Sequence, residues 1–384
     1  MGEFLNRQAR DLRQGGIRAF FDRAAKYENV INLGIGEPDL DTPRPVIEAG
    51  YEAMLAGKTH YTPNAGELAV REQVAAYLSG FGVEAEPAGE IIMTCGGMGA
   101  VAMSLLCTID PGDEVLIQDP QWLNYRSQVK FAGGVPVPVP VYEENGFSLK
   151  AEDIAARLTP RSKILMLNSP NNPTGAVMTE RDLAEVAELA ERHDLLVISD
   201  EVYCELLYDG AKHRSIAALP GMEKRTVIVN SFSKSFSMTG WRVGFAAGPR
   251  ELIAKMTVLQ ENLVACAPAF GQYAAAYALQ TACDLEKMRG VYQRRRDLMV
   301  DGLNAIPGIH CEKPQGAFYA FPNIRALGRS SQALAEELLD RAQVVAIPGS
   351  AFGENGEGFL RMAYANSEEN ILEALRRIQR CLDL

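Results

Sequence analysis

This sequence of 384 residues has few histidines and no spacing of cysteines or histidines that is typical of a metal site. It has four histidines and seven cysteines, and none of them is arranged as C-x-x-C, H-x-x-x-H or H-E-x-x-H. Zinc-dependent catalysis therefore has no support in the sequence, and we predict no metal site. The odd number of scattered cysteines is typical of reduced, mostly buried thiols rather than of a disulfide framework.

Negatively charged residues outnumber positively charged ones. The chain has 38 Lys and Arg residues against 49 Asp and Glu residues, which gives a net charge of −11. Such a surface repels a phosphate backbone, so we do not expect a nucleic-acid partner. An anionic ligand must instead be held by a local cluster of basic groups.

A continuous apolar run of the length that a membrane span requires, about 20 residues, is missing. The two long uncharged stretches, 91–109 and 262–283, are interrupted by glycine, threonine and serine in the first and by proline and glutamine in the second. The first residues, MGEFLNRQARDLRQGG, alternate charged and polar groups and do not have the apolar core of a secretory signal. We therefore expect no membrane partner and a cytoplasmic protein.

What the sequence does contain is an alternation of short apolar runs with longer helical patterns. With 47% hydrophobic and 23% charged residues, the composition is that of a globular protein with a large core. Strands are predicted at 90–94, 114–119, 135–141, 163–168, 195–200, 226–231 and 243–248, with helices at 98–108, 125–131 and 179–193. This pattern predicts the α/β class, with a mostly parallel sheet sandwiched by helices.

The pattern of predicted helices and strands changes beyond residue 285. A charged helix at 285–303 is followed by predicted strands within 316–324, 344–349 and 359–365 and by a closing helix at 367–382. We interpret this part as a smaller α+β domain onto which the first 40 or so residues pack. The predicted domains are a large one, 45–285, and a small discontinuous one, 1–44 plus 286–384.

The segment SFSKSFSMTGWRVGF, residues 231–245, places Lys234 directly after an apolar strand. At the C-terminal edge of a sheet, desolvation lowers the pKa of a lysine and frees its amine as a nucleophile. Arg242, Ser231 and Ser233 add donors suited to a phosphate. A nucleophilic lysine beside a phosphate clamp suggests pyridoxal phosphate (PLP), although an isolated lysine at a strand end is more often a solvated surface residue.

Polar residues follow two further predicted strands. The turn NSPNNPTG contains Asn172, which could donate to a phenolate oxygen, although N-P-T-G alone is only a turn signal. The strand VISDEVY ends with Asp200, followed three residues later by Tyr203. A carboxylate there can hold a proton on a pyridine nitrogen, which lets the ring accept electrons. The alternative for Asp200 is a helix N-cap.

Taken in order, NSPNNPTG, SDEVY, SFSK and GWR resemble the fold-type I, class I/II aminotransferases that use PLP, and LGIGEPDLDTP, THYTPNAG and FLRMAYA fit the same pattern. The resemblance covers nearly the whole chain. It implies PLP as the cofactor, a homodimer with shared active sites, and ping-pong transfer of an amino group. The donor would be an L-amino acid, either aspartate or an aromatic or apolar one, and the acceptor a 2-oxo acid such as 2-oxoglutarate.

The resemblance also implies roles for single residues. Lys234 resembles the lysine that binds the cofactor covalently and then serves as the general base, Asp200 the partner of the pyridine nitrogen, and Asn172 with Tyr203 the pair on the ring's 3-oxygen. The other implied contacts are Ser231, Ser233 and Arg242 with the phosphate, Trp122 stacked on the ring, Arg361 and the main chain of Gly36 with the substrate carboxylate, and Tyr61 with the neighbouring subunit's phosphate. Trp122 and Asn172 are expected to line the substrate site as well.

One turn departs from the family pattern. Many relatives carry Ser, Thr or Lys in the turn that is Gly97-Met98-Gly99 here. We therefore expect this turn to hold the phosphate through backbone N–H groups at a helix N-terminus, without a side-chain contact.

Three other classes of protein are alternatives to this interpretation. The motif GIGEPD contains G-x-G but lacks the third glycine and the helix of a dinucleotide fingerprint, so a nicotinamide dehydrogenase is not predicted. A PLP-dependent lyase or decarboxylase on the same scaffold begins with the same proton abstraction, and the motifs separate it poorly from an aminotransferase. A non-catalytic PLP-binding regulator would need a DNA-binding extension, for which residues 1–32 are too short.

Overall fold

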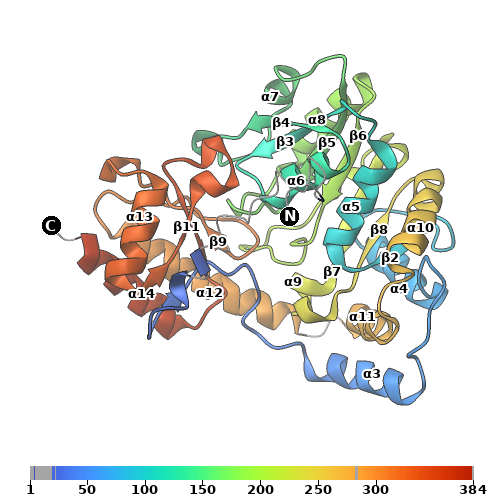
Figure 1. The fold of residues 1–384 in the computed structure, drawn as a ribbon, viewed down its shortest axis with the longest axis horizontal. Helices are drawn as coiled ribbons and strands as arrows, with labels where there is room; N and C mark the ends of the chain where they lie inside the picture. The colour runs from blue at the N-terminus through green and yellow to red at the C-terminus, as the bar shows by residue number, and fades with distance from the viewer. Residues whose placement is uncertain (1–3, 5–19, 22, 282–283, 383–384) are drawn as a thin grey trace.

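The structure is a computed structural model that describes residues 4, 20–21, 23–281 and 284–382 (Figure 1). Its central feature is a seven-stranded sheet with the order β2-β8-β7-β6-β5-β3-β4. The strands are β2 (Ile91–Thr94), β3 (Glu114–Asp119), β4 (Val135–Pro140), β5 (Ser162–Asn168), β6 (Leu196–Asp200), β7 (Thr226–Ser231) and β8 (Gly244–Ala247). Strand β8 runs antiparallel to β2 and β7, and the other four strand pairs are parallel, which confirms the predicted mostly parallel sheet.

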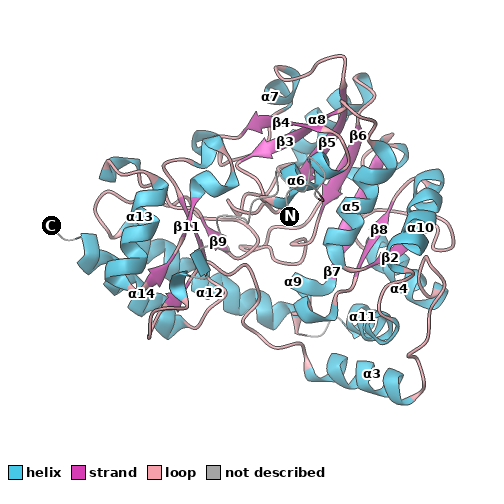
Figure 2. Cartoon of the chain, viewed as in Figure 1, coloured by secondary structure: helices cyan, strands magenta, loops and turns pink. Residues whose placement is uncertain are grey.

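Both faces of the sheet are buried, because successive residues of each strand enter opposite cores. On β3, Leu116 belongs to one apolar cluster, and Val115 and Ile117 belong to the other. The first cluster is completed by α4 (Leu68–Ser79), α8 (Glu180–Arg192) and α11 (Ala269–Thr281), and the second by α5 (Gly96–Thr108), α6 (Asn124–Phe131) and α10 (Arg250–Val264). Figure 2 shows the helices on either side of the strands.

Local chemistry explains several element boundaries. The edge strand β4 reads VPVPVP, and proline is tolerated there because an edge strand has one side without ladder hydrogen bonds. Helix α8 begins after Thr179, whose hydroxyl accepts from the Asp182 backbone N–H at 3.1 Å. The helix predicted to begin at 98 begins two residues earlier, at Gly96 in α5.

A second, smaller group of elements lies beside the sheet. It contains a three-stranded antiparallel sheet with the order β11-β12-β9. Its elements are α12 (Leu285–Asn304), β9 (Tyr319–Ala320), α13 (Ser331–Glu337), β10 (Val344–Val345), β11 (Ile347–Pro348), β12 (Leu360–Ala363) and α14 (Glu368–Leu382). Near the N-terminus, β1 (Ile31–Asn32) pairs in parallel with β10, so the N-terminal segment packs among the C-terminal elements (Figure 1).

These strands are shorter than predicted. The run 316–324 contributes only β9, because Ala317 adopts a left-handed φ of 59° that interrupts the extended backbone. The run 344–349 is split in two, since β10 pairs with β1 whereas β11 pairs with β12. The domain boundaries at 45 and 285 remain our proposal. The packing of α3 (Arg44–Leu55) against α11 supports them, because it joins residues after 44 to the large sheet's helices.

No helix within 23–281 or 284–382 has the length and apolar character needed to cross a bilayer. The six described cysteines are free thiols, and Cys283 lies outside the described residues.

Candidate active site

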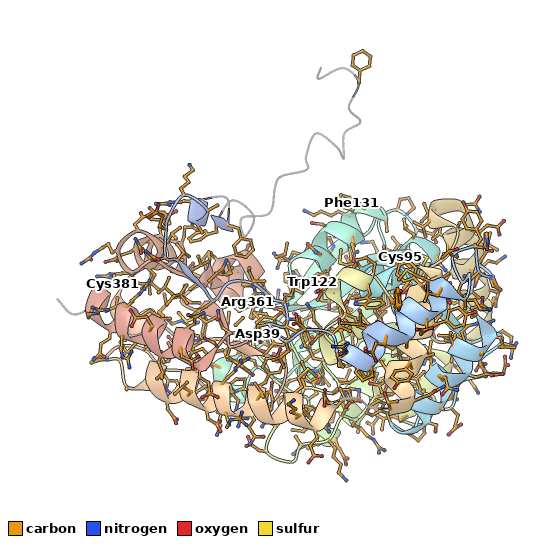
Figure 3. The ribbon with its side chains drawn as sticks, turned by 90° about the horizontal axis from the view of Figure 1, so that it is seen from below. Asp39, Cys95, Trp122, Phe131, Arg361 and Cys381 are labelled. Atoms are coloured by element: carbon orange, nitrogen blue, oxygen red, sulfur yellow. The ribbon has the colours of Figure 1, made fainter. Side chains whose placement is uncertain are left out.

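A cavity of about 420 Å³ opens between the two groups of elements. Its floor is formed where the neighbouring parallel strands β5, β6 and β7 end, at Asn168, Asp200 and Ser231. Its other wall comes from β9, β12 and the segment 34–37. Figure 3 shows Trp122 and Arg361 in the middle of the molecule, between the C-terminal elements and the central sheet. The C-terminal ends of parallel strands are the usual place for a ligand in such sheets.

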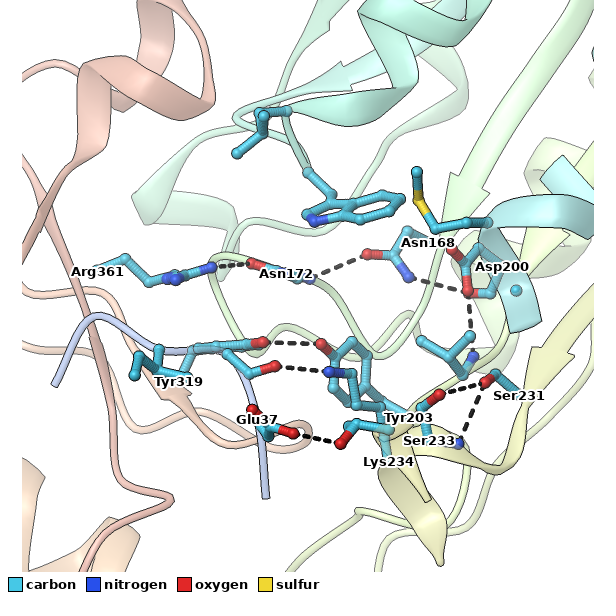
Figure 4. A pocket seen from close by; sticks show the side chains of 18 of the residues that line it. Glu37, Asn168, Asn172, Asp200, Tyr203, Ser231, Ser233, Lys234, Tyr319 and Arg361 are labelled. Atoms are coloured by element: carbon cyan, nitrogen blue, oxygen red, sulfur yellow. Dashed lines mark hydrogen bonds between the residues drawn. The ribbon is translucent and has the colours of Figure 1, made fainter. Parts of the chain in front are cut away.

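Lys234 lies in the cavity on the short helix α9 (Phe232–Ser235), directly after β7. Its Nζ donates to the carbonyl oxygen of Gly36 at 2.5 Å (Figure 4). Burial, helped by the charges of Arg361 and Arg242 and opposed by Glu37 and Asp200, lowers the pKa of Lys234 to about 8. The amine is therefore partly neutral, and nucleophilic, near neutral pH.

Asp200 ends β6 with its carboxylate facing the cavity. The hydroxyl of Tyr125 on α6 donates to Asp200 Oδ2 at 2.6 Å, and the Val202 N–H donates to Oδ1 at 3.2 Å. Burial raises the pKa of Asp200 to about 6, although both hydrogen bonds lower it. At neutral pH the carboxylate is thus ionised and able to hold a protonated nitrogen.

Tyr203 and Asn172 also line the cavity. The Tyr203 hydroxyl lies 2.8 Å from the hydroxyl of Tyr319, and burial raises the pKa of Tyr203 well above its usual value, which keeps it protonated. Asn172 is fixed by its backbone N–H, which donates to Asn168 Oδ1 at 3.0 Å. Asn168 in turn donates to the main-chain oxygen of Asp200 at 3.0 Å, so one chain of amides joins these groups (Figure 4).

Arg361 on β12 forms the opposite end of the cavity and is only 4% exposed. Its Nη1 donates to Asn172 Oδ1 at 3.1 Å and its Nη2 to the Gly34 carbonyl at 2.6 Å. The guanidinium lies between the rings of Tyr319 and Phe352, at 4.6 and 4.8 Å from their centroids. Its buried Nε has no hydrogen-bond partner among the described residues. A planar cation with this open donor suits a carboxylate.

Small donors gather at the other end. The hydroxyls of Ser231 and Ser233 lie 2.8 Å apart. Arg242, exposed and in a left-handed conformation at φ 56°, donates to the Thr239 carbonyl at 3.0 Å and forms no ion pair with any described residue. A Cβ on Gly96 would come within 2.6 Å of Arg242 Nη2, so glycine leaves room for this guanidinium. Gly97 lines the cavity nearby.

The remaining predicted residues fall into two groups. Met98, Gly36 and Trp122 line the cavity, and the Trp122 ring meets the Tyr125 ring edge to face at 5.2 Å. Gly99 and Tyr61 are not among the lining residues: Gly99 lies in the first turn of α5, and Tyr61 is 88% exposed on the surface of this chain.

Comparison with known proteins identifies the family of this chain. The family model described as "Aminotransferase class I and II" matches residues 28–378. The chain belongs to the class I and II aminotransferases. It is 45% identical over 370 residues to aromatic-amino-acid aminotransferase 2 of Thermococcus litoralis, covering 95% of both chains, and 46% identical over 370 residues to aspartate aminotransferase of Pyrococcus abyssi, again covering 95% of both.

Solved structures place the fold in the same family. The aspartate aminotransferase of Thermus thermophilus with maleate superposes with a TM-score of 0.93 at 38% identity, covering 98% of this chain and 99% of that one. The aromatic aminotransferase of Pyrococcus horikoshii OT3 superposes with a TM-score of 0.90 at 46% identity, covering 94% of this chain and 98% of that one. The fold-type I prediction is confirmed, and the chain is an amino-acid aminotransferase.

Sequence reasoning missed several residues of this aminotransferase's cavity. Tyr125, Asn168, Tyr319 and Glu37 line it and were not assigned a site role. Asn168 stands in the NSPNNPTG motif and Glu37 in GIGEPD, so motif position offered a signal for both. Tyr125 and Tyr319 reach the site through packing between distant segments, for which the local pattern gives no signal.

Proposed function

We propose that the aminotransferase holds PLP in this cavity and acts preferentially on L-amino acids with apolar side chains. The observation that carries the proposal is the meeting of Lys234, Asp200 and Arg361 in one cavity, from β7, β6 and β12. The donor set fits the cofactor. Arg242 lacks an ion partner among the described residues, and it lies near two serine hydroxyls because Ser231 donates to the main-chain carbonyl of the residue that follows Arg242. This pair of features suits a phosphate, and Asp200 suits a ring nitrogen.

When bound, PLP supplies a ring that accepts the electrons of the bond broken at the substrate's α carbon. The protein's own part begins with Lys234, whose lowered pKa leaves enough neutral amine to bind the cofactor covalently and, once released, to accept and return the substrate's α proton. Asp200 would hold a proton on the ring nitrogen, and Tyr203 and Asn172 would hydrogen-bond the ring oxygen.

Substrate orientation falls to Arg361. Its guanidinium is immobilised between two aromatic rings and by two acceptors, so it meets a carboxylate with little loss of side-chain entropy. We propose that the α-carboxylate is held there, beside Asn172 and the main chain of Gly36, with the α carbon left within reach of Lys234. Trp122 covers the ring and excludes water from this space.

The preference for apolar side chains rests on the charges of the cavity wall. Among the described residues that line the cavity, the cations are Lys234, Arg242 and Arg361. We assign these three side chains to the cofactor and to the α-carboxylate of the substrate. The apolar side chains that line the cavity include those of Phe21, Ile35, Trp122 and Leu123. Among the lining residues that the structure describes, none supplies a further cation for the second carboxylate of aspartate, and the Glu37 carboxylate repels one.

Exposed apolar side chains support the homodimer. On α3 they are Ile47, Tyr51, Met54 and Leu55, and on α10 they are Val258, Leu263 and Val264, all of them more than one-third exposed. Tyr61, which follows α3 in the sequence, is exposed as well. We propose that a second copy covers this surface and that Tyr61 reaches the partner's phosphate site. Residence in the cytoplasm stays a prediction.

The experiment is a donor panel under single-turnover conditions without an acceptor. We expect L-phenylalanine and L-leucine to convert the bound cofactor faster than L-aspartate does. A faster reaction with L-aspartate would overturn the apolar preference. Adding 2-oxoglutarate, pyruvate or oxaloacetate separately tests the reaction type: restoration of the starting absorbance by an oxo acid supports transamination, whereas steady release of ammonia without any acceptor indicates a lyase.

A further inference from the structure

The hydroxyl of Tyr125 makes one hydrogen bond among the described residues, and it goes to the carboxylate that the proposed function places on the cofactor ring. Tyr125 is 2% exposed and lies on α6, at the end of the segment DPQWLNY that contains Trp122. We infer that Tyr125 is a positioning residue, which acts through Asp200 by keeping that carboxylate ionised and aimed at the ring nitrogen. The inference rests on the proposed function.

The need for such a residue follows from burial. A carboxylate buried in an apolar surrounding favours its protonated form, which cannot stabilise a positive charge on a ring nitrogen. Of the residues that the structure describes, two donate to the Asp200 carboxylate: Tyr125 at 2.6 Å and the Val202 N–H at 3.2 Å. The shorter bond, from a neutral hydroxyl to an ion in a water-poor site, is the stronger of the two. Tyr125 is thus the main support of the ionised form.

The charges around Asp200 do not replace that support. Lys234 favours the ionised carboxylate, but its positive charge is lost when the amine becomes neutral or binds the cofactor. Glu201 disfavours it, and this neighbour is itself buried, accepting from Ser199, Ser215 and His213 at 2.7 to 2.8 Å. Tyr203 and the amide of Asn168 complete the surroundings without adding charge at neutral pH. The Tyr125 hydroxyl therefore acts in every stage of the cycle.

The same short segment also carries the ring-stacking residue. Trp122 and Tyr125 are three residues apart, and their rings meet at 5.2 Å with an interplanar angle of 80°. Helix α6 is tied to α5 by Gln128, whose Nε2 donates to the Met98 carbonyl at 3.2 Å. The start of α6 thus fixes both the residue over the ring face and the donor behind the ring nitrogen's partner.

The test compares Y125F with Y77F, a matched control. Tyr77 is another tyrosine of the large sheet's surroundings, and its hydroxyl contacts Cys204 Sγ at 3.1 Å rather than any cavity residue. PLP is titrated into each cofactor-free protein between pH 5.5 and 8.5. We expect Y125F to bind PLP on the order of tenfold more weakly at pH 7. Its acid-side midpoint should move up by about one pH unit, since a tenfold change corresponds to one pKa unit.

A double-mutant cycle with D200N separates positioning from general packing. If Tyr125 acts through the Asp200 charge, Y125F adds no further loss of PLP affinity in the D200N background. The inference is overturned if Y125F matches Y77F, or if the loss is the same with and without D200N. The midpoint does not depend on the amount of folded protein, so partial unfolding of Y125F leaves this readout intact. Failure of the wild-type protein to bind PLP would instead overturn the proposed function.

Discussion

Two arginines stand at opposite ends of the cavity and are built in opposite ways. Arg361 is buried, sits between two aromatic rings and has fixed acceptors, and burial lowers its pKa. Arg242 is exposed, lies in a left-handed turn and, within the described part of the chain, donates to the Thr239 carbonyl alone. We propose that the buried, preorganised cation selects the exchanging substrates, whereas the solvated cation holds the resident cofactor.

The largest expected effect comes from removing Lys234, which lies between the two arginines. K234A should slow the conversion of an amino donor on the order of a thousandfold, because the general base is lost. Single-turnover absorbance measurements check this, with K212A as the control because Lys212 is exposed. If K234A kept the wild-type rate, the chemistry assigned to this cavity would be wrong.

The second prediction concerns the buried end. R361K should lower kcat/KM for amino donors about a hundredfold, because lysine cannot form the bidentate pair and leaves a buried carboxylate poorly paired. PLP affinity should stay within about twofold of wild type. A loss of PLP affinity as large as the loss of kcat/KM would contradict the division of labour between the two arginines.

The exposed end should respond more mildly and in another quantity. R242K is expected to weaken PLP binding on the order of tenfold, since the charge remains but the paired donors are lost. The KM for the donor should stay near its wild-type value when PLP is saturating. Equilibrium titration of PLP and steady-state kinetics on the same preparation measure both; a raised donor KM with unchanged PLP affinity is the contrary result.

The smallest expected effect is on the pH dependence of cofactor capture by the unloaded protein. Protonated Lys234 cannot attack, so the capture rate should rise with pH, reach half its maximum near pH 8, where the pKa of Lys234 lies, and level off about one unit higher. Both arginines lower this pKa, so R242Q should raise the midpoint by less than about one unit. Stopped-flow measurements from pH 6 to 10 check this. A rate that still rises beyond pH 10 would indicate an ordinary, solvated lysine.

Much of the site could be predicted because its residues follow apolar strands. Lys234 and Asp200 come after neighbouring parallel strands, and the ends of such strands meet at one edge of the sheet, so sequence order alone brought them together. The roles of Asn172 and Arg361 followed from the resemblance of their motifs. These assignments stay proposals until they are measured, but the structure places all four residues on one cavity.

What escaped prediction depends on packing between distant segments. The contact of Tyr203 with Tyr319 joins residues 116 positions apart, and the Tyr125 hydroxyl meets Asp200 across 75 positions. Neither pairing leaves a periodic or motif signal. The short strands of the smaller sheet were overestimated for a similar reason, since the left-handed backbone at Ala317 follows from its tertiary surroundings and alanine does not favour it.

The central claim is that Lys234 carries the cofactor. Reduction of the PLP-loaded protein with sodium borohydride, followed by trypsin digestion and mass spectrometry, tests it most directly. We expect the cofactor on the peptide of residues 226–242, with cleavage after Lys234 blocked. Cofactor attached to any other lysine, or to none, would contradict the account.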